Sequence, residues 1–219
     1  IGLELGTVWA RLGAEVEVIE FLPRILPGMD AEIAKKFMTI AKKQGLKFRL
    51  STAVKSAKAG KNGVSLTVTP ANGGDEETIK ADIALVSVGR HPATDGLGLE
   101  RIGVTMTPRG CIAVDARFET SIEDVYAIGD VIHGPMLAHK AEEDAVAAVE
   151  MMAGKPGHVD YDLVPGIVYT APEIATLGKS EEALTEAGID FAKGAFPFSA
   201  NSRARAQGHS DGFVKILAC

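Results

Sequence analysis

The sequence contains only two cysteines, Cys111 and Cys219, among its 219 residues. Two cysteines so far apart are too few for the disulfide framework of a secreted domain. They also lack the close spacing of a metal site or a redox pair. A reducing compartment is therefore the default location.

Long apolar runs and an excess of positive charge are absent as well. No uncharged apolar run approaches the roughly 18 residues that would predict a membrane helix. The formal net charge is −6. Nucleic acids and anionic membranes attract basic proteins, so neither is expected as the main partner. With 46% hydrophobic residues, the chain can bury a core and form one large domain or two smaller ones.

The most informative stretch runs from residue 120 to residue 143. Residues 125–128 are apolar and predict a short buried strand, after which Gly129 would let a ligand approach the backbone. Asp130 then lies at the carboxyl end of this strand. Ligands bind at that end in open α/β sheets, and a carboxylate there can accept hydrogen bonds from a polyol.

A helix is predicted directly after Asp130, and Gly154 and Pro156 would stop it. Its N-terminus would favour negative charge on a bound ring or phosphate. The predicted apolar face consists of Leu137, Ala138, Ala141, Ala145, Ala148, Val149 and Met152.

The N-terminal region has the pattern of a dinucleotide-binding unit. A helix ending near Gly13 is followed by an alternating strand, residues 14–20, and Glu20 lies 20 − 2 = 18 positions after Gly2. If Gly2 is the third glycine of a dinucleotide fingerprint, Glu20 is placed to bind both ribose hydroxyls. Its charge would repel a 2′-phosphate, which favours NAD over NADP. The alternative is that Glu20 is a solvated charge at a strand end.

These stretches resemble a known family. Residues 120–130 and 136–142 are similar to the second flavin-binding motif of the flavoprotein disulfide reductases, in particular those that oxidise dihydrolipoamide. Residues 1–4 and 18–21 resemble the NAD half of the same family. The resemblance implies an α/β fold with Rossmann-like, three-layer FAD- and NAD-binding domains, followed by an incomplete α+β dimerisation domain. Because the chain starts abruptly, we expect it to be an internal part of such a protein.

The resemblance also implies roles for individual residues. Asp130 would hold the ribityl chain of FAD, and the backbone of residues 136–139 would face the flavin. Residues 1–4 would line the adenosine and pyrophosphate of NAD, Val54 would lie near its adenine, and Gly89 would contact NAD. The candidate cofactor-binding residues are Ile1, Gly2, Leu3, Glu4, Glu20, Val54, Gly89, Asp130, Met136, Leu137, Ala138 and His139.

Three domains are predicted from this pattern: an NAD-binding domain, residues 1–89, a central FAD-contacting domain, residues 90–157, and the start of a dimerisation domain, residues 161–219. The apolar run 83–89 predicts a parallel strand buried on both faces. Residues 111–114, with Cys111, predict another strand.

Several further elements follow from local patterns. Asp30 should begin a helix whose apolar face is Ile33, Ala34, Phe37, Ile40 and Ala41, and Ser180 should cap a short helix. Strands are expected at residues 46–50, 64–68, 191–196 and 213–217, with a turn at 72–75. Arg203 and Arg205 are expected in a solvated loop or at an interface.

The implied function is the oxidation of dihydrolipoamide, with FAD as bound electron carrier and NAD as hydride acceptor. The family's Cys-x4-Cys redox pair and His-x4-Glu acid–base pair are not found in this sequence. We therefore assign no catalytic residue and no metal ligand, and we expect the 219 residues alone to be inactive.

The resemblance implies two partners: a second copy of the protein, as a homodimer, and the lipoyl-bearing acyltransferase of a 2-oxo acid dehydrogenase complex. It places the protein in a bacterial cytoplasm or a mitochondrial matrix. One alternative is another disulfide reductase or an NADH oxidase on the same scaffold. A second alternative, from a different class, is a nucleotide-binding or assembly module without redox activity.

Overall fold

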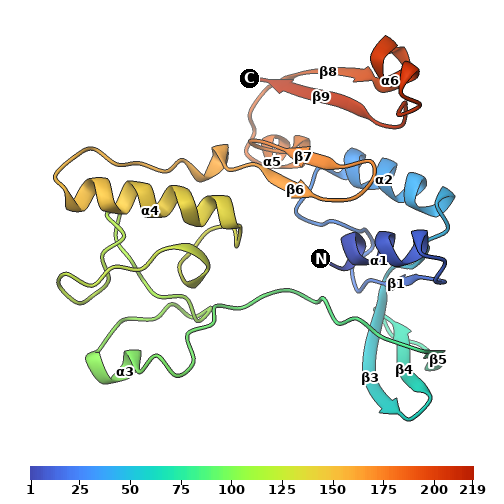
Figure 1. Ribbon diagram of the computed structural model, residues 1–219, viewed down its shortest axis with the longest axis horizontal. Helices are drawn as coiled ribbons and strands as arrows, with labels where there is room; N and C mark the ends of the chain where they lie inside the picture. Colours follow the sequence, from blue (N-terminus) through green and yellow to red (C-terminus); the bar gives the residue numbers. More distant parts are fainter. The chain divides into compact units, whose positions relative to one another are not determined.

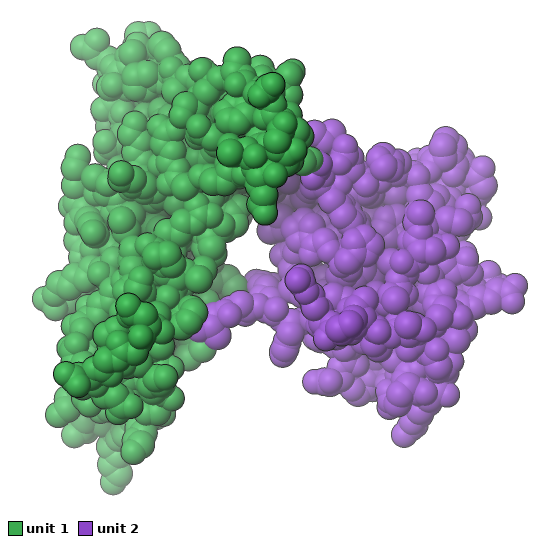
Figure 2. Space-filling model, turned by 180° about the vertical axis from the view of Figure 1, so that it is seen from behind, with its two compact units in different colours: residues 1–87, 166–219 green, residues 88–165 purple.

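The computed structural model describes residues 1–219, which form two compact units (Figures 1 and 2). Unit 1 comprises residues 1–87 and 166–219, and unit 2 comprises residues 88–165. None of the helices has both the length and the apolar character needed to span a membrane.

Unit 1 begins with a helix and a parallel strand pair. Helix α1 (Gly2–Arg11) precedes β1 (Glu17–Ile19), and helix α2 (Ala31–Lys43) connects β1 to its parallel neighbour β2 (Lys47–Arg49). A side chain at the buried Gly6 would place its Cβ 3.4 Å from Val16, which directly precedes β1. The glycine thus allows α1 to pack close to the strand, as in dinucleotide-binding βαβ units.

Helix α2 provides much of the core of unit 1. The Asp30 carboxylate accepts hydrogen bonds from the backbone N–H groups of Glu32 and Ile33, at 3.0 and 3.4 Å, and so caps the helix as predicted. The predicted apolar face is also confirmed, because Ala34, Phe37, Ile40 and Ala41 are buried and Ile33 packs against the same core. Ile25, Leu46, Val168 and Ile174 complete the cluster around Ala34, Phe37 and Ala41.

A three-stranded antiparallel sheet follows, with β4 (Gly63–Pro70) between β3 (Thr52–Gly60) and β5 (Glu77–Ala81). The expected turn at residues 72–75 connects β4 to β5. A bulge between Val54 and Ser56 shifts the register of β3 against β4.

The C-terminal part of unit 1 consists of two antiparallel hairpins and short helices (Figure 1). Its elements are β6 (Gly166–Val168), β7 (Ile174–Thr176), α5 (Glu181–Glu186), β8 (Ala192–Pro197), η3 (Phe198–Ala200), α6 (Ser202–Ala206) and β9 (Phe213–Ala218). The Ser180 cap on α5 and the last two strands are confirmed. The loop predicted around Arg203 and Arg205 is wrong. The Asn201 side chain caps Ala204 N–H at 2.9 Å and starts the short helix α6.

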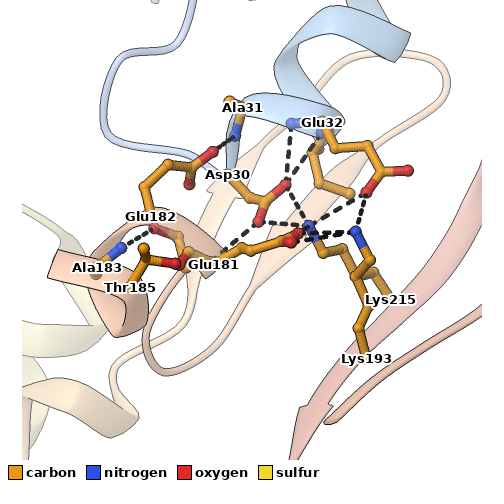
Figure 3. A network of polar contacts seen from close by, with 11 residues as sticks. Asp30, Ala31, Glu32, Glu181, Glu182, Ala183, Thr185, Lys193 and Lys215 are labelled. Carbon is orange, nitrogen blue, oxygen red and sulfur yellow. Dashed lines mark hydrogen bonds and ion pairs between the residues drawn. The ribbon is translucent and has the colours of Figure 1, made fainter. Parts of the chain in front are cut away.

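Lys215 in β9 is the centre of an ion-pair network that joins β9 to the starts of α2 and α5 (Figure 3). Its Nζ lies 2.8 Å from Asp30 Oδ2 and 3.2 Å from Glu32 Oε2, and it also donates to Glu181. The side chains of Lys215 and Asp30 are only 5% and 8% exposed. Asp30 therefore serves both as a helix cap and as the buried partner of a cation.

The network shifts the pKa values of Asp30 and Lys215. Burial alone would raise the pKa of Asp30, but the Lys215 ammonium and the backbone N–H groups of Glu181 and Ile33 more than offset this and hold the pKa below its ordinary value. Burial alone would lower the pKa of Lys215, but the surrounding carboxylates, Asp30 first, raise it above its ordinary value. Asp30 and Lys215 are therefore both charged near neutral pH.

Unit 2 contains α3 (Leu99–Ile102), η1 (Gly129–Val131), α4 (Ala138–Met152) and η2 (Tyr161–Leu163). Its core consists of Val104, Ile112, Phe118, Ala127, Ile132, Ala147 and Ala148. Most of its remaining backbone is irregular, with isolated β-bridges between Met106 and Ile112 and between Glu119 and Tyr126.

The parallel strand predicted at residues 83–89 is wrong. The run forms no strand and all its residues are exposed, Ile83 to 80% and Val88 to 93%. An apolar run indicates a need for burial, but a parallel strand also requires hydrogen-bonding neighbours and covering helices. The only parallel pair in this chain, β1 and β2, does not pair with it.

The strands predicted at residues 111–114 and 125–128 are also wrong, because each is reduced to one bridge residue. Their backbone groups bond to nearby loops: Ile112 N–H donates to Val131 O, and Ala127 N–H donates to Phe118 O. Ile112 and Ala127 are nevertheless buried. The apolar pattern therefore predicted the burial of these two residues correctly, but it predicted strands where none form.

The predicted apolar face of α4 is mostly wrong. Val149 and Met152 are 61% and 49% exposed, and of the predicted residues only Ala148 is fully buried. The face that packs inward instead presents Lys140, Asp144, Ala147 and Ala148. A buried charged pair thus replaces the expected alanine stripe.

Candidate nucleotide-binding sites

Gly129 and Asp130 form a tight turn in η1. Gly129 has a φ of +71°, and a Cβ at this position would lie 3.1 Å from the Cβ of Ala141 in α4. A side chain would therefore be strained both by its backbone conformation and by its closeness to the helix. The Asp130 side chain is 47% exposed, with Arg90 Nη1 3.9 Å from Oδ2. Its carboxylate is thus accessible to a hydroxyl-bearing ligand.

The N-terminus of α4 lies beside this turn and has no side-chain cap. The first N–H groups of a helix have no partner within the helix, and the helix dipole places partial positive charge there. Residues 136–139 lead into this end, and the His139 Nε2–H donates to Pro165 O at 2.8 Å. Nε2 of the His139 imidazole is therefore engaged with a backbone carbonyl, and the backbone role of His139 toward the flavin stays a prediction.

These features fit the polyol and ring of a flavin. An accessible carboxylate can accept hydrogen bonds from ribityl hydroxyls, and uncapped N–H groups can stabilise negative charge on a ring. The cofactor roles of Asp130, Met136, Leu137, Ala138 and His139 stay predictions.

In unit 1, the first residues of α1 lie against the end of segment 83–87. A Cβ on Gly2 would lie 2.5 Å from Ser87 Oγ, so the two segments approach closely. Glu4 Oε1 accepts a hydrogen bond from Tyr169 N–H at 2.9 Å, which is the largest cause of the lowered pKa of Glu4. The Glu4 carboxylate thus ties α1 to the segment between β6 and β7, a contact that the sequence did not predict.

Glu20 directly follows β1, as expected. Its backbone N–H donates to Arg49 O, and its own carbonyl accepts from Thr52 N–H at the start of β3. Glu20 Oε1 accepts from Leu22 N–H at 2.9 Å, which leaves Oε2 for a ribose hydroxyl. The structure thus brings Glu20 close to the start of β3, where Val54 is 49% exposed.

Gly89 has a φ of +120°, and no atom lies within 4 Å of the position its Cβ would occupy. It belongs to unit 2, whereas Ile1, Gly2, Leu3, Glu4, Glu20 and Val54 belong to unit 1. The NAD-binding roles of all these residues stay predictions, as do the three domain boundaries.

The sequence did not identify Lys140 and Asp144, which bond to Gly129, or Tyr161, which bonds to Asp144. Helical periodicity could have placed Lys140 and Asp144 on one face of α4, but it could not have identified Tyr161 or shown that the charged pair is buried. Lys140 and Asp144 share the helical face of Ala147 and Ala148, with a spacing of four residues.

The chain combines a βαβ unit that ends in an acidic residue with a glycine–aspartate turn beside a helix N-terminus. Both features are typical of pyridine-nucleotide flavoproteins. The chain belongs to the pyridine nucleotide-disulphide oxidoreductase family, which residues 1–145 match. Residues 164–219 match the dimerisation domain of the same family. The expected family is therefore confirmed.

Curated relatives match the whole chain. Dihydrolipoyl dehydrogenase from Pisum sativum mitochondria is 56% identical over 218 residues, covering 100% of this chain and 44% of the relative. The mitochondrial enzyme from Homo sapiens is 51% identical, over 99% of this chain and 43% of the relative. Leghemoglobin reductase from Glycine max is 56% identical, covering 100% of this chain and 42% of the relative. The chain thus spans less than half the length of these relatives.

Solved structures confirm the expected fold class. The HOCl-induced flavoprotein disulfide reductase RclA from Escherichia coli matches with a TM-score of 0.86 and 28% identity, over 98% of this chain and 48% of that chain. LpdA from Mycobacterium tuberculosis matches with a TM-score of 0.88 and 27% identity, over 98% of this chain and 46% of that chain. The chain has the mixed α/β fold of this family, with part of a dimerisation domain.

Proposed function

We propose that the complete protein containing these residues is a dihydrolipoamide dehydrogenase. It oxidises dihydrolipoamide to lipoamide and passes the electrons through bound FAD to NAD. The observation that carries this proposal is the 51–57% identity, over essentially all of this chain, to plant and human relatives named dihydrolipoyl dehydrogenase.

The site geometry supports the choice of cofactors. FAD, when bound, supplies the redox chemistry, and this chain's residues position and polarise it. The Asp130 carboxylate accepts hydrogen bonds from the ribityl chain, and the N-terminus of α4 faces the flavin ring. Glu20 binds the adenosine ribose of NAD, with residues 1–4, Val54 and Gly89 along the rest of the dinucleotide.

A second candidate function has specific support. Leghemoglobin reductases from Glycine max and Vigna unguiculata are each 56% identical to this chain, as similar as the plant dehydrogenases. An assay of the complete protein with dihydrolipoamide plus NAD, and separately with NADH plus ferric leghemoglobin, distinguishes the two functions by their relative kcat/KM. A colourless protein inactive in both assays would instead support the nucleotide-binding module without redox activity.

The partner and location follow from the same proposal. A dihydrolipoamide dehydrogenase serves a lipoyl-bearing acyltransferase of a 2-oxo acid dehydrogenase complex. Relatives in plants and mammals are named as mitochondrial, which supports the mitochondrial matrix, with a bacterial cytoplasm as the alternative.

Replacing Asp130 with alanine should weaken FAD binding in the complete protein. Loss of a charged hydrogen bond costs about 1.5–3 kcal/mol, or roughly a tenfold to hundredfold rise in Kd. Titration of flavin-free protein with FAD measures this change. Asp95→Ala removes an exposed aspartate in the same unit but outside residues 120–130; it is the matched control and should bind FAD normally. Unchanged affinity in Asp130→Ala would remove Asp130 from the flavin site.

The complete protein should be a two-fold dimer, because residues 164–219 match a dimerisation domain and homodimer interfaces are usually isologous. Light scattering at micromolar concentration should give twice the mass of one chain. A monomeric mass at that concentration would contradict the expectation.

A further inference from the structure

Lys140 and Asp144 form a fully buried ion pair on the inner face of α4. Both side chains are 0% exposed, and Lys140 Nζ lies 2.7 Å from Asp144 Oδ2. Removing two charges from water is costly, and an apolar pair of similar volume is often equally stable or more so. The burial of these charges therefore calls for an explanation beyond stability.

The pair holds both backbone groups of a single residue, Gly129. Lys140 Nζ donates to Gly129 O at 3.0 Å, and Gly129 N–H donates to Asp144 Oδ2 at 3.0 Å. The Gly129 carbonyl belongs to the planar peptide that connects Gly129 to Asp130. Fixing that carbonyl fixes the plane of the peptide and thus the positions of the Asp130 N and Cα atoms. The same carbonyl accepts the Ile132 N–H at 3.2 Å, which closes the turn around Asp130 and limits the directions open to its side chain.

Tyr161 contacts both members of the Lys140–Asp144 pair. Its hydroxyl donates to Asp144 Oδ1 at 2.9 Å, and its ring centroid lies 5.1 Å from Lys140 Nζ. Burial raises the pKa of the Tyr161 hydroxyl above its ordinary value, and the Asp144 carboxylate raises it further, so the hydroxyl remains a donor. Every buried polar atom of the group is satisfied. A network with all partners in place can hold one defined geometry.

We propose that Lys140 and Asp144 are positioning residues that act through Gly129 to aim the Asp130 carboxylate at the ribityl chain of FAD. This inference rests on the proposed function. Neither residue needs to touch the cofactor. Tyr161 supports the pair by fixing the second oxygen of Asp144.

The experiment separates positioning from stability with a charge-free pair. The double variant Lys140→Met plus Asp144→Leu removes both side-chain hydrogen bonds to the Gly129 backbone and leaves no unpaired charge. It is compared with wild type, with Asp130→Ala and with the triple variant, all as complete flavin-free protein. FAD affinity is measured by fluorescence titration, and stability by urea denaturation of the same samples.

We expect the double variant to fold but to be less stable than wild type, because the Gly129 N–H and the Tyr161 hydroxyl lose their partner. It should bind FAD roughly tenfold more weakly, a coupling in the range found for residues within one network. In the Asp130→Ala background the same double change should have little further effect, because there is no carboxylate left to aim. Tyr161→Phe, which keeps the ion pair, should weaken FAD binding by roughly twofold to tenfold. It provides the test if the double variant does not fold.

Other outcomes overturn the inference. Wild-type FAD affinity in the double variant and in Tyr161→Phe would show that the pair is only structural. If the double change weakens FAD binding equally in wild type and in Asp130→Ala, the Lys140–Asp144 pair does not act through Asp130. In both cases the proposed function would stand. If wild-type protein binds no FAD at all, the proposed function fails and the inference fails with it.

Discussion

Replacing Lys215 with methionine is expected to destabilise the protein by about 3 kcal/mol, because removing one partner of a buried ion pair leaves an uncompensated charge. Asp30 would be buried without its cation, next to the carboxylates of Glu32 and Glu181. The helix cap on α2 and the attachment of β9 would weaken together. Urea denaturation, with the free energy of unfolding extrapolated to water, measures the change.

Two control variants separate charge from other effects. Asp30→Asn keeps an oxygen that can cap α2 but removes the negative charge, so it should cost less than Asp30→Ala. Lys47→Met removes an ion pair with Glu15 whose side chains are 63% and 90% exposed, and it should change stability by no more than about 0.5 kcal/mol. A loss in Lys215→Met as small as that in Lys47→Met would contradict the importance of the network.

The network also gives stability a defined pH dependence. The pKa of Asp30 is lower in the folded protein than in the unfolded chain. Its contribution is therefore present above the unfolded pKa of about 4 and is lost as the pH falls through the folded pKa. The pKa of Lys215 is raised on folding, so its contribution is present below about pH 10 and is lost as the pH rises through the folded pKa. Asp30→Asn should lose less stability than wild type between roughly pH 5 and pH 2.

Local chemistry in the sequence predicted many elements correctly. The Asp30 and Ser180 caps lie within four residues of the N–H groups they bind, so the information is contained in a short window. The buried face of α2 followed from its helical period, because this helix buries apolar side chains alone. The family resemblance supplied the candidate site residues, which periodicity could not have done.

The errors arise where structure depends on distant partners. The apolar run 83–89 would need neighbouring strands, and this chain supplies none to it. On α4, a search for apolar residues selected Val149 and missed Lys140 and Asp144. Burial of that charged pair depends on the Gly129 backbone and on the Tyr161 hydroxyl, which are close only in the folded protein.

Changing Glu20 is expected to alter the choice between NAD and NADP. Loss of its hydrogen bonds to the adenosine ribose should cost about 1.5–3 kcal/mol, or roughly a tenfold to hundredfold loss of NAD affinity. The same loss of charge should help NADP, whose 2′-phosphate carries close to two negative charges. An arginine at this position could also pair with that phosphate.

The structure indicates which variants isolate this effect. Because Glu20 Oε1 also accepts the Leu22 N–H, Glu20→Ala could disturb the loop after β1 as well as the ribose contact. Glu20→Gln retains an oxygen for Leu22 but removes the charge. Glu17, at the start of β1, pairs with Arg49 at 2.6 Å and is not expected to contact the nucleotide, so Glu17→Ala is the matched control.

The measurement is kcat/KM for NAD and for NADP in the complete protein, for wild type and for the alanine, glutamine and arginine variants of Glu20. The ratio of NAD to NADP efficiency should fall in the order wild type, glutamine, arginine, because each step replaces repulsion of the 2′-phosphate with less repulsion or with attraction. Glu17→Ala should retain the wild-type ratio. If all variants share that ratio within error, Glu20 is a solvated strand-end charge, and the assignment of Gly2 as the third glycine of the fingerprint is wrong.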